Sequence, residues 1–199
     1  MKILIASGPT REKLDPVRFL SNYSTGAMGK ALAQAAKKRN HRVTWIRCPD
    51  QAQSARELEK TLRKNLPHHD ALLMAAAVCD VRPERVSSSK IKKGNLSSIR
   101  LVKNPDILTA LSKLKKKGQM FVGFGLESEN LLKNGTEKLK KKKLDAILLQ
   151  RVTEKNTPFG DKKIDAILLK RNGTLIRFKN QTKGRIAERI VGEVERFLE

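Results

Sequence analysis

Short apolar runs alternate with longer segments of helical periodicity along this 199-residue chain, and that alternation constrains its fold more than any other feature. The apolar runs have the length of strands and occupy residues 2–7, 43–47, 70–76, 120–125 and 144–150. Strands that helices cover on both faces read as continuous apolar runs, and they lie in parallel sheets. The sequence therefore predicts an α/β fold with a buried, mainly parallel sheet.

The intervening segments carry helix signals, and we expect helices at residues 26–38, 54–66, 104–118, about 129–143 and from 182 to near the C-terminus. Apolar residues recur every three or four positions in the first of these, which gives it one apolar face. Ser54 stands three residues before Glu57 in a capping-box arrangement. Asn104, Pro105 and Asp106 are predicted to be the cap, the first-turn proline and the first-turn acid of the third helix. Thr182 is the expected cap of the last helix.

A hairpin is predicted near the C-terminus, where Asn172-Gly173 separates strand-like runs at 164–170 and 175–179. An Asn-Gly pair between two such runs is a strong turn signal, and the hairpin would add antiparallel strands to the sheet. Residues 77–100 are expected to form a long loop. Together these elements predict one domain, residues 1–199, with a Rossmann-like three-layer sandwich that ends in an antiparallel hairpin.

The chain is strongly basic, because 43 lysines and arginines face 20 acidic residues and give a formal net charge of +23. Such a charge attracts polyanions, whether nucleotides, nucleic acid or anionic membrane, without selecting among them. No run approaches the roughly 18 apolar residues of a membrane span, and the short apolar N-terminus is unlike a signal peptide. Cys48 and Cys79 are too few for a disulfide framework and match no paired metal spacing. We therefore expect a soluble, cytoplasmic protein with reduced cysteines.

Three unusual segments follow predicted strands, at the edge where an open parallel sheet binds its ligands. The first, residues 7–29, is rich in glycine, serine and asparagine and leads into a helix, whose N-terminus attracts phosphate or carboxylate. An ordinary strand-to-helix connection explains this segment equally well. It is not a P-loop, because no Gly-Lys-Ser or Gly-Lys-Thr occurs in it.

The second segment combines small residues at 75–77 with a serine- and lysine-bearing loop at 87–94. Lysines on a mobile loop can close over phosphates and neutralise the charge that develops as pyrophosphate leaves. A lysine-rich chain also has solvated surface loops of this kind, so the pattern alone does not choose. The third segment consists of two stretches, residues 102–107 and the strand end at 122–125. Taken singly, the first is better explained as a helix cap and the second as a core strand.

Taken together and in order, these segments resemble the phosphopantothenoylcysteine synthetase family. The similar blocks are GPTREKLDPVRFLSNYSTGAMG, AAAVCDVRP, KIKK, LVKNPDIL and VGFGLES, which begin at residues 8, 75, 90, 101 and 122. The resemblance implies a homodimeric ligase that joins 4′-phosphopantothenate to L-cysteine through an acyl-nucleotide intermediate. It further implies the bacterial branch, which converts CTP to CMP and pyrophosphate, with Mg²⁺ arriving on the nucleotide.

The resemblance also assigns roles to particular residues. Asn22 would handle the carbonyl of the acyl-nucleotide, Lys90 would begin the lysine loop, and Arg18 would serve the second step or substrate binding. Gly8, Ser24 and Gly26 represent the phosphate or substrate loop, and the glycine-rich helix start would hold the triphosphate together with the lysine loop. Nucleotide-binding positions are matched by Met74, Ala75, Ala76, Asp80, Lys90, Pro105, Asp106, Ile107, Leu108, Phe124, Lys138 and Lys142. No metal-binding residue is implied.

The chain departs from the family pattern at Cys79 and Val81, around the acidic position, and at Gln150-Arg151, where an Asn-Asp pair is usual. These positions bear on nucleotide specificity more than on the class of reaction. Many bacterial members are fused to a flavin-dependent decarboxylase domain that this chain lacks. A stand-alone ligase is therefore expected, with a separate decarboxylase as a potential partner.

Two other classes of protein stay open on the sequence. A nicotinamide-dependent reductase shares the fold class, but no complete Gly-x-Gly-x-x-Gly follows the first strand and no lysine stands four residues after Tyr23. A basic nucleic-acid-binding module would use the +23 charge directly, yet aromatic residues make up only 4% of the chain. His41, His68 and His69 form no recognisable metal pattern.

Overall fold

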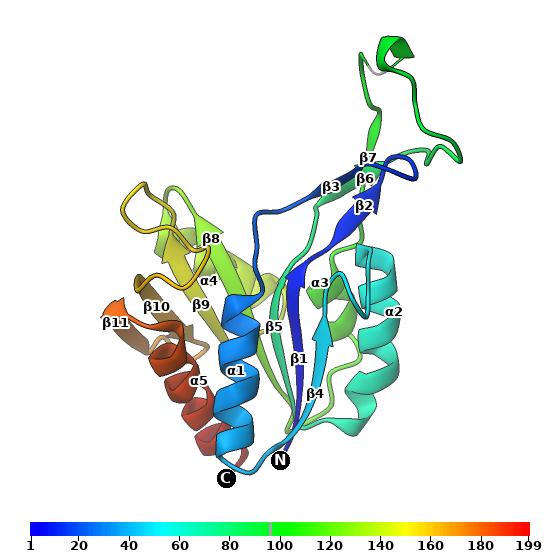
Figure 1. Ribbon diagram of the computed structural model, residues 1–199. Coiled ribbons are helices and arrows are strands. Elements are labelled where there is room, and N and C mark those ends of the chain that lie inside the picture. Colours follow the sequence, from blue (N-terminus) through cyan, green and yellow to red (C-terminus); the bar gives the residue numbers. More distant parts are fainter. Residues whose placement is uncertain (96) are drawn as a thin grey trace.

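The computed structural model describes residues 1–95 and 97–199 and is built around a seven-stranded sheet (Figure 1). The strands follow the spatial order β11-β10-β9-β8-β5-β1-β4. In chain order they are β1 (Lys2–Pro9), β4 (Arg42–Arg47), β5 (Ala71–Ala77), β8 (Met120–Glu127), β9 (Ala146–Arg151), β10 (Ile164–Lys170) and β11 (Leu175–Gln181). Strands β4, β1, β5, β8 and β9 pair in parallel, whereas β10 is antiparallel to both neighbours. The predicted sheet and its C-terminal hairpin are confirmed.

Helices cover both faces of this sheet, which makes the predicted three-layer sandwich (Figure 1). One face carries α1 (Ala27–Lys38) and α5 (Lys183–Leu198), and the other carries α2 (Ala55–Asn65), α3 (Ile107–Ser112) and α4 (Leu131–Lys141). Successive strand residues point to opposite faces, so Ile3 and Ile5 join the core under α1 and α5, while Leu4 joins the core under α2, α3 and α4. All three side chains are fully buried. Burial on both faces is the reason that the strands read as continuous apolar runs.

The helix boundaries confirm two predicted caps and correct a third. The Ser54 hydroxyl accepts a hydrogen bond from the Glu57 N–H at 3.3 Å, and Thr182 caps α5 in the same way through the Arg185 N–H. The helix expected over residues 104–118 is shorter, because Asp106 is its cap and accepts from the Thr109 N–H at 3.2 Å. Asn104 therefore lies outside the helix, and its side-chain amide donates to the Cys79 carbonyl instead.

Two small antiparallel sheets lie in the segments that follow β1 and β5. One pairs β2 (Arg11–Lys13) with β3 (Phe19–Ser21), and the other pairs β6 (Val81–Pro83) with β7 (Leu101–Lys103). A short 3₁₀ helix, η2 (Lys93–Asn95), lies between β6 and β7, and η1 (Leu66–His68) follows α2. The expectation of a loop throughout residues 77–100 is wrong at β6 and η2. Both elements have only three residues, which is too short for the sequence to show a periodicity. Leu96, which belongs to the same expected loop, lies outside the described residues. We call residues 10–21, 80–95 and 97–103 the arm. It projects beyond the carboxyl ends of the strands (Figure 1).

The first turn of α1 lies directly on the end of β1, and glycine permits this approach. A Cβ atom on Gly29 would lie 2.0 Å from the Cβ of Ser7, so no larger residue fits between helix and strand. Gly8 has φ +82°, a conformation that L side chains rarely adopt, and its missing Cβ leaves room for the Cys48 carbonyl. These contacts hold the N-terminus of α1 at the carboxyl edge of the sheet.

We expect Gly29→Ala to lower the free energy of unfolding by about 1 to 3 kcal/mol, because the added methyl group meets Ser7 in a packed interface. Gly184→Ala is the matched control, since Gly184 is also in a first helical turn but its Cβ would meet no atom closer than 3.9 Å. We expect that control to gain about 0.4 to 1 kcal/mol. Urea unfolding followed by circular dichroism measures both changes. Equal stability of Gly29→Ala and the wild type would contradict the close packing of α1 on β1.

Candidate active site

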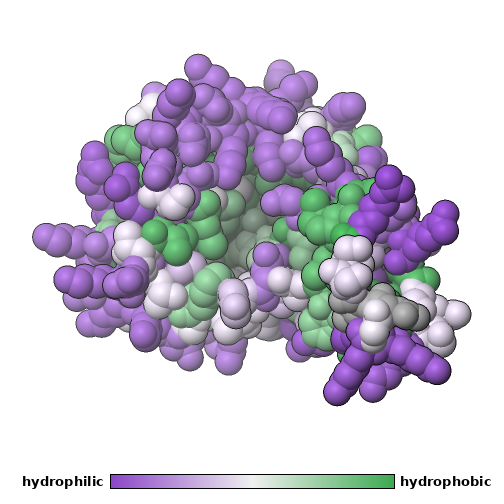
Figure 2. Space-filling view, turned by 90° about the horizontal axis from the view of Figure 1, so that it is seen from above, coloured by the Kyte–Doolittle hydropathy of each residue, from purple (hydrophilic) through white to green (hydrophobic). Residues whose placement is uncertain are grey.

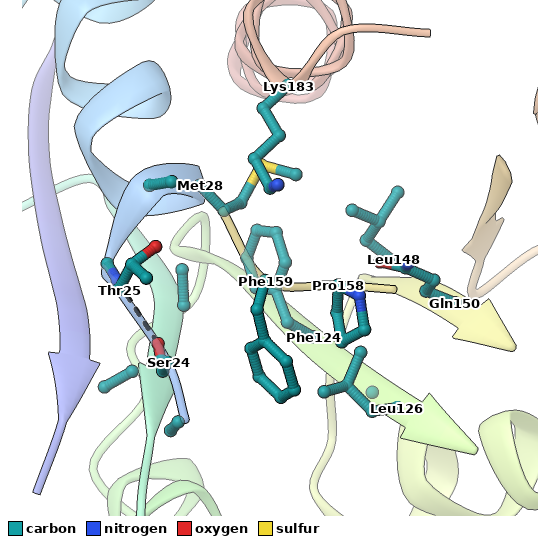
Figure 3. A pocket seen from close by; sticks show the side chains of 16 residues that line it. Ser24, Thr25, Met28, Phe124, Leu126, Leu148, Gln150, Pro158, Phe159 and Lys183 are labelled. Carbon is teal, nitrogen blue, oxygen red and sulfur yellow. Dashed lines mark hydrogen bonds between the residues drawn. The ribbon is translucent and has the colours of Figure 1, made fainter. Parts of the chain in front are cut away.

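A cleft opens at the carboxyl edge of the sheet, between the start of α1 and the ends of β5 and β8. It encloses about 750 Å³ of empty space, part of it open to solvent. Seen from above, this edge is hollowed and lined by hydrophobic residues, with hydrophilic residues around the rim (Figure 2). The lining residues are Ser24, Thr25, Gly26, Ala27, Met28, Ala75, Ala76, Ala77, Phe124, Gly125, Leu126, Leu148, Gln150, Pro158, Phe159 and Lys183 (Figure 3).

The loop before α1 forms one wall of the cleft and is shaped for an anion. Gly26 takes φ +74° as the residue before the helix, and the Ser24 hydroxyl accepts from the Gly26 N–H at 3.3 Å. Among the residues that the structure describes, no side chain caps α1, and its first turn contains no acidic residue. The first N–H groups of the helix are thus free to bind a ligand, and the helix dipole favours a negative one. Two residues of the predicted phosphate or substrate loop, Ser24 and Gly26, line the cleft. The third, Gly8, lies beneath them, since a Cβ atom on Gly26 would be 3.4 Å from the Gly8 Cα.

Asn22 is positioned at the mouth of the cleft by the end of β5. Its side-chain amide donates to the Ala77 carbonyl at 3.0 Å and contacts the Cys79 sulfur at 3.6 Å. Burial raises the pKa of the Cys79 thiol, which keeps the sulfur neutral. The backbone N–H of Cys79 in turn bonds to the buried hydroxyl of Thr10. The departure from the family pattern at Cys79 therefore sits against a predicted catalytic residue and helps to orient it.

Arg18 and Lys90 lie on the arm rather than in the cleft. The guanidinium of Arg18 bonds to the buried carboxylate of Asp15 at 2.5 and 3.0 Å and to the Ile91 carbonyl at 2.8 Å. The Ile91 N–H also donates to Asp15, at 3.2 Å. The Arg18 guanidinium, together with these N–H donors, holds the pKa of Asp15 far below its usual range. Arg18 thus anchors the lysine loop, and Lys90, next to Ile91, is exposed at that anchor.

The predicted nucleotide-binding residues fall on two sides of the sheet. Ala75, Ala76 and Phe124 line the cleft, Met74 is buried in the core beneath it, and Asp80 is exposed just before β6. Pro105, Asp106, Ile107 and Leu108 lead into α3, where Ile107 and Leu108 are buried in the core under α2, α3 and α4.

The two predicted nucleotide-binding lysines already have carboxylate partners. Lys142 pairs with Asp106 at 3.2 Å, and Lys138 pairs with Glu127 at 2.5 Å. Burial alone would raise the pKa of Asp106, but the bonds from Thr109 and the Lys142 ammonium outweigh it and lower the pKa. The structure therefore brings the ends of α3 and α4 together on the face opposite α1 and α5.

Sequence reasoning did not single out several side chains that line the cleft, among them Leu148, Pro158, Phe159 and Lys183. Pro158 and Phe159 belong to the connection between β9 and β10, and the Phe159 ring lies 5.9 Å from that of Tyr23. Nothing in their local pattern marks them as cleft residues. Lys183 does carry a signal, because a lysine in the first turn of a helix opposes the helix dipole.

The histidines and cysteines of the described residues form no metal site or disulfide. Among the described residues, no three His, Cys, Asp or Glu side chains come together as a metal site. His41 pairs with Glu195 at 2.8 Å, and His69 bonds to Asn65 and Thr44. Both cysteines are free and buried. In the part of the chain that the structure describes, no helix has both the length and the apolar character needed to cross a bilayer.

The chain belongs to the family of the DNA/pantothenate metabolism flavoprotein C-terminal domain, whose model matches residues 1–198. Among curated proteins it is 41% identical over 161 residues to the coenzyme A biosynthesis bifunctional protein CoaBC of Borreliella burgdorferi, covering 74% of this chain and 41% of that one. A prokaryotic protein named cysteine/cysteine sulfinic acid decarboxylase is 35% identical over 97% of this chain and 57% of its own length. The chain spans about half the length of these curated relatives.

A solved structure of the C-terminal domain of a CoaBC protein matches the fold with a TM-score of 0.81 at 29% identity. The match covers 99% of this chain and 95% of that one. The chain therefore corresponds to the C-terminal domain of these longer proteins, and the predicted relation to the phosphopantothenoylcysteine synthetase family is confirmed.

Proposed function

We propose that this chain is a phosphopantothenate–cysteine ligase, which condenses 4′-phosphopantothenate with L-cysteine through an acyl-cytidylate formed from CTP. The observation that carries the proposal is the cleft itself. Blocks that are far apart in the sequence, at residues 22–29, 75–79 and 122–125, meet around it. The CoaBC proteins that the chain resembles are named for coenzyme A biosynthesis. The solved structure of a CoaBC C-terminal domain supports matching the chain to that part of these proteins.

The first step would activate the carboxylate of phosphopantothenate on the α-phosphate of CTP with loss of pyrophosphate. An ionised carboxylate is a poor acyl donor until one of its oxygens belongs to a good leaving group. Lys90 is proposed to neutralise charge on the departing pyrophosphate, and Lys138 and Lys142 to hold the nucleotide phosphates. Mg²⁺ would enter on the triphosphate, whose oxygens are its usual ligands.

In the second step the amine of cysteine attacks the acyl carbonyl and CMP leaves. Asn22 is proposed to turn the amide N–H that contacts the Cys79 sulfur toward the carbonyl oxygen as negative charge develops there. The Ala77 carbonyl and the Cys79 sulfur orient that amide at the mouth of the cleft. Arg18 would act through the arm, by fixing the lysine loop that it anchors. Free thiols fit a reducing compartment, and we place the protein in the cytoplasm.

The function is tested by incubating the chain with phosphopantothenate, cysteine, Mg²⁺ and one nucleoside triphosphate, and following pyrophosphate release. We expect release with CTP that depends on phosphopantothenate and is faster than with ATP. Pantothenate and alanine, offered in place of the two substrates, are the controls. Turnover that is faster with ATP would overturn the CTP assignment, and no release with any nucleotide would overturn the ligase proposal.

The two steps should fail separately in two variants. Lys90→Gln should slow pyrophosphate release by about 10² to 10³, as expected for loss of one charge-stabilising donor. Asn22→Asp should retain activation but block amide formation, because a carboxylate repels the developing oxyanion, so acyl-cytidylate should accumulate. Mass spectrometry of quenched single-turnover reactions measures that intermediate, and Lys37→Gln on exposed α1 surface is the control for lysine loss. The division of roles fails if Asn22→Asp shows no intermediate and releases pyrophosphate as slowly as Lys90→Gln.

We also propose that the chain acts as a homodimer through its arm. The arm carries exposed apolar side chains, Val17 at 61%, Val86 at 57%, Phe19 at 46% and Leu101 at 45%. Such clusters on a surface mark protein interfaces. In addition, Lys90 and Arg18 are not among the described residues that line the cleft of their own chain. If the arm packs against a second chain, it would place these two residues near the cleft of that chain.

Light scattering at micromolar concentration should therefore give twice the 22.4 kDa chain mass. Val17→Glu on the arm should shift the protein toward monomer, because an interface does not accept an unpaired buried charge. Phe197→Glu, at a similarly exposed apolar residue on α5, should leave the mass unchanged. A monomeric wild-type protein would reject the dimer, and dissociation by Phe197→Glu alone would move the interface to α5.

A further inference from the structure

A second groove, lined by cations, lies at the amino edge of the sheet, at the opposite end of the strands from the cleft. Its walls are the C-terminal half of α4, the end of β10 and the β10–β11 turn, and it encloses about 860 Å³ of empty space, part of it open. Lys170 pairs with Ala146, the first residue of β9, which fixes the groove at this edge. The lining combines four cations with two buried apolar side chains: Lys140, Lys143, Lys170, Arg171, Leu139 and Leu169.

Segments that are far apart in the chain bring their cations to this groove. The Lys143 carbonyl accepts hydrogen bonds from the Lys115 ammonium at 3.3 Å and from the Arg171 guanidinium at 2.7 Å. The buried carboxylate of Asp145 is the partner of both cations, at 2.5 Å from Lys115 and 3.4 Å from Arg171. Burial lowers the pKa of Lys115, and the charge of Arg171 adds to this effect against the carboxylate of Asp145. One carboxylate thus serves two cations, and an excess of positive charge remains beside the groove.

The lysines of this groove differ from those proposed to hold the nucleotide. Lys138 and Lys142, four residues apart on one side of α4, are paired with carboxylates. Lys140 and Lys143 line the groove, and neither they nor the exposed Lys141 make an ion pair with a described residue. Two separate sets of cations therefore lie on different sides of the same helix.

A run of lysines at the end of a helix is commonly a solvated face that the helix dipole stabilises, but Lys143 does not fit this explanation. It follows the C-cap of α4 and has φ +50°. The turn is a Schellman motif, in which the Lys143 N–H bonds to the Lys140 carbonyl at 3.1 Å and the Leu144 N–H to the Leu139 carbonyl at 3.0 Å. Glycine or asparagine usually occupies such a position, because other side chains rarely adopt the left-handed conformation. The turn therefore does not account for a lysine here, whereas an anion in the groove does.

A linear polyanion suits this groove better than a bilayer. Cations stand on both walls, Lys140 and Lys143 on one and Lys170 and Arg171 on the other, whereas an anionic bilayer presents a flat surface. A nucleic-acid strand carries phosphates along its length and would meet both walls. None of the described lining residues is aromatic, so contact through the phosphates is expected, with little base stacking and little sequence preference.

We infer that this groove binds single-stranded nucleic acid through its phosphates, as a second activity of the chain. The inference does not depend on the proposed ligase reaction, because the groove and the cleft share no described lining residue. It also gives a use for part of the net charge of +23, which binding of small substrates does not require.

Fluorescence anisotropy with a labelled poly(U) RNA of about 20 nucleotides measures this binding over a range of salt concentrations. With four cations in the groove, the logarithm of the association constant should fall against the logarithm of salt with a slope of about −3. The double variant Lys140→Gln/Lys143→Asn should weaken binding about 10- to 30-fold at about 0.1 M salt and reduce the slope by about 1.4, the effect of two lost phosphate contacts. The matched control Lys37→Gln/Lys60→Gln removes the same charge from exposed positions of α1 and α2 and should bind nearly as well as the wild type.

Thermal unfolding separates binding from a structural role of Lys143. Asparagine adopts the left-handed conformation more readily than lysine, so Lys143→Asn should melt at or above the wild-type Tm while it binds the RNA more weakly. A lower Tm with unchanged RNA affinity would mean that this lysine serves only the turn, and it would overturn the inference.

The remaining outcomes locate the bound strand. Added CTP should not displace the RNA, and displacement would place the RNA in the cleft instead. Equal weakening in the two double variants would show diffuse attraction to the whole charge, and tighter binding to phosphatidylserine vesicles than to RNA at the same salt would assign the groove to a membrane. Each of these results contradicts the inference, as would a wild-type chain that does not bind the RNA at about 0.05 M salt.

Discussion

The contact between the first turn of α1 and the end of β1 is the constraint on which the cleft depends. Without a side chain at Gly29, the helix lies close enough to Ser7 that its N-terminus opens at the carboxyl edge of the sheet. Ser7 is buried there, and its hydroxyl accepts from the indole N–H of Trp45 at 2.7 Å, which ties β4 to the same contact. The wall of the cleft that the start of α1 forms is therefore a consequence of helix–strand packing.

The two faces of the sheet divide the chemistry of the site. The α1–α5 face presents helix N-termini and a buried lysine, whereas the α2–α3–α4 face presents lysines that carboxylates already hold, as in the pair of Lys142 with Asp106. The proposed ligase reaction uses two phosphate-bearing substrates, whose charges repel one another.

The arm differs in kind from the rest of the molecule. The sheet is held by two cores of fully buried side chains, but the arm is held by short strands and by a few polar contacts, of which Asp15 with Arg18 and Ile91 is the most concentrated. Few buried apolar contacts allow a segment to move while the core stays fixed. The proposed role of Lys90 would need such a construction, since its segment would have to close over a nucleotide and open again.

The sequence by itself determined the seven main strands, the covering helices and the hairpin, because burial on both faces leaves a continuous apolar run and an Asn-Gly turn is a local signal. It did not determine the strands of the arm, because they are too short to show a periodicity. It also did not determine the start of α3, because Asn104 and Asp106 are both acceptable helix caps. The choice is made by a tertiary contact, in which the side-chain amide of Asn104 donates to the Cys79 carbonyl. Nor did it place Phe159 or Lys183 in the cleft. Those positions follow from where the β9–β10 connection and α5 lie in space, and only tertiary packing decides that, because the partners are far apart in the chain.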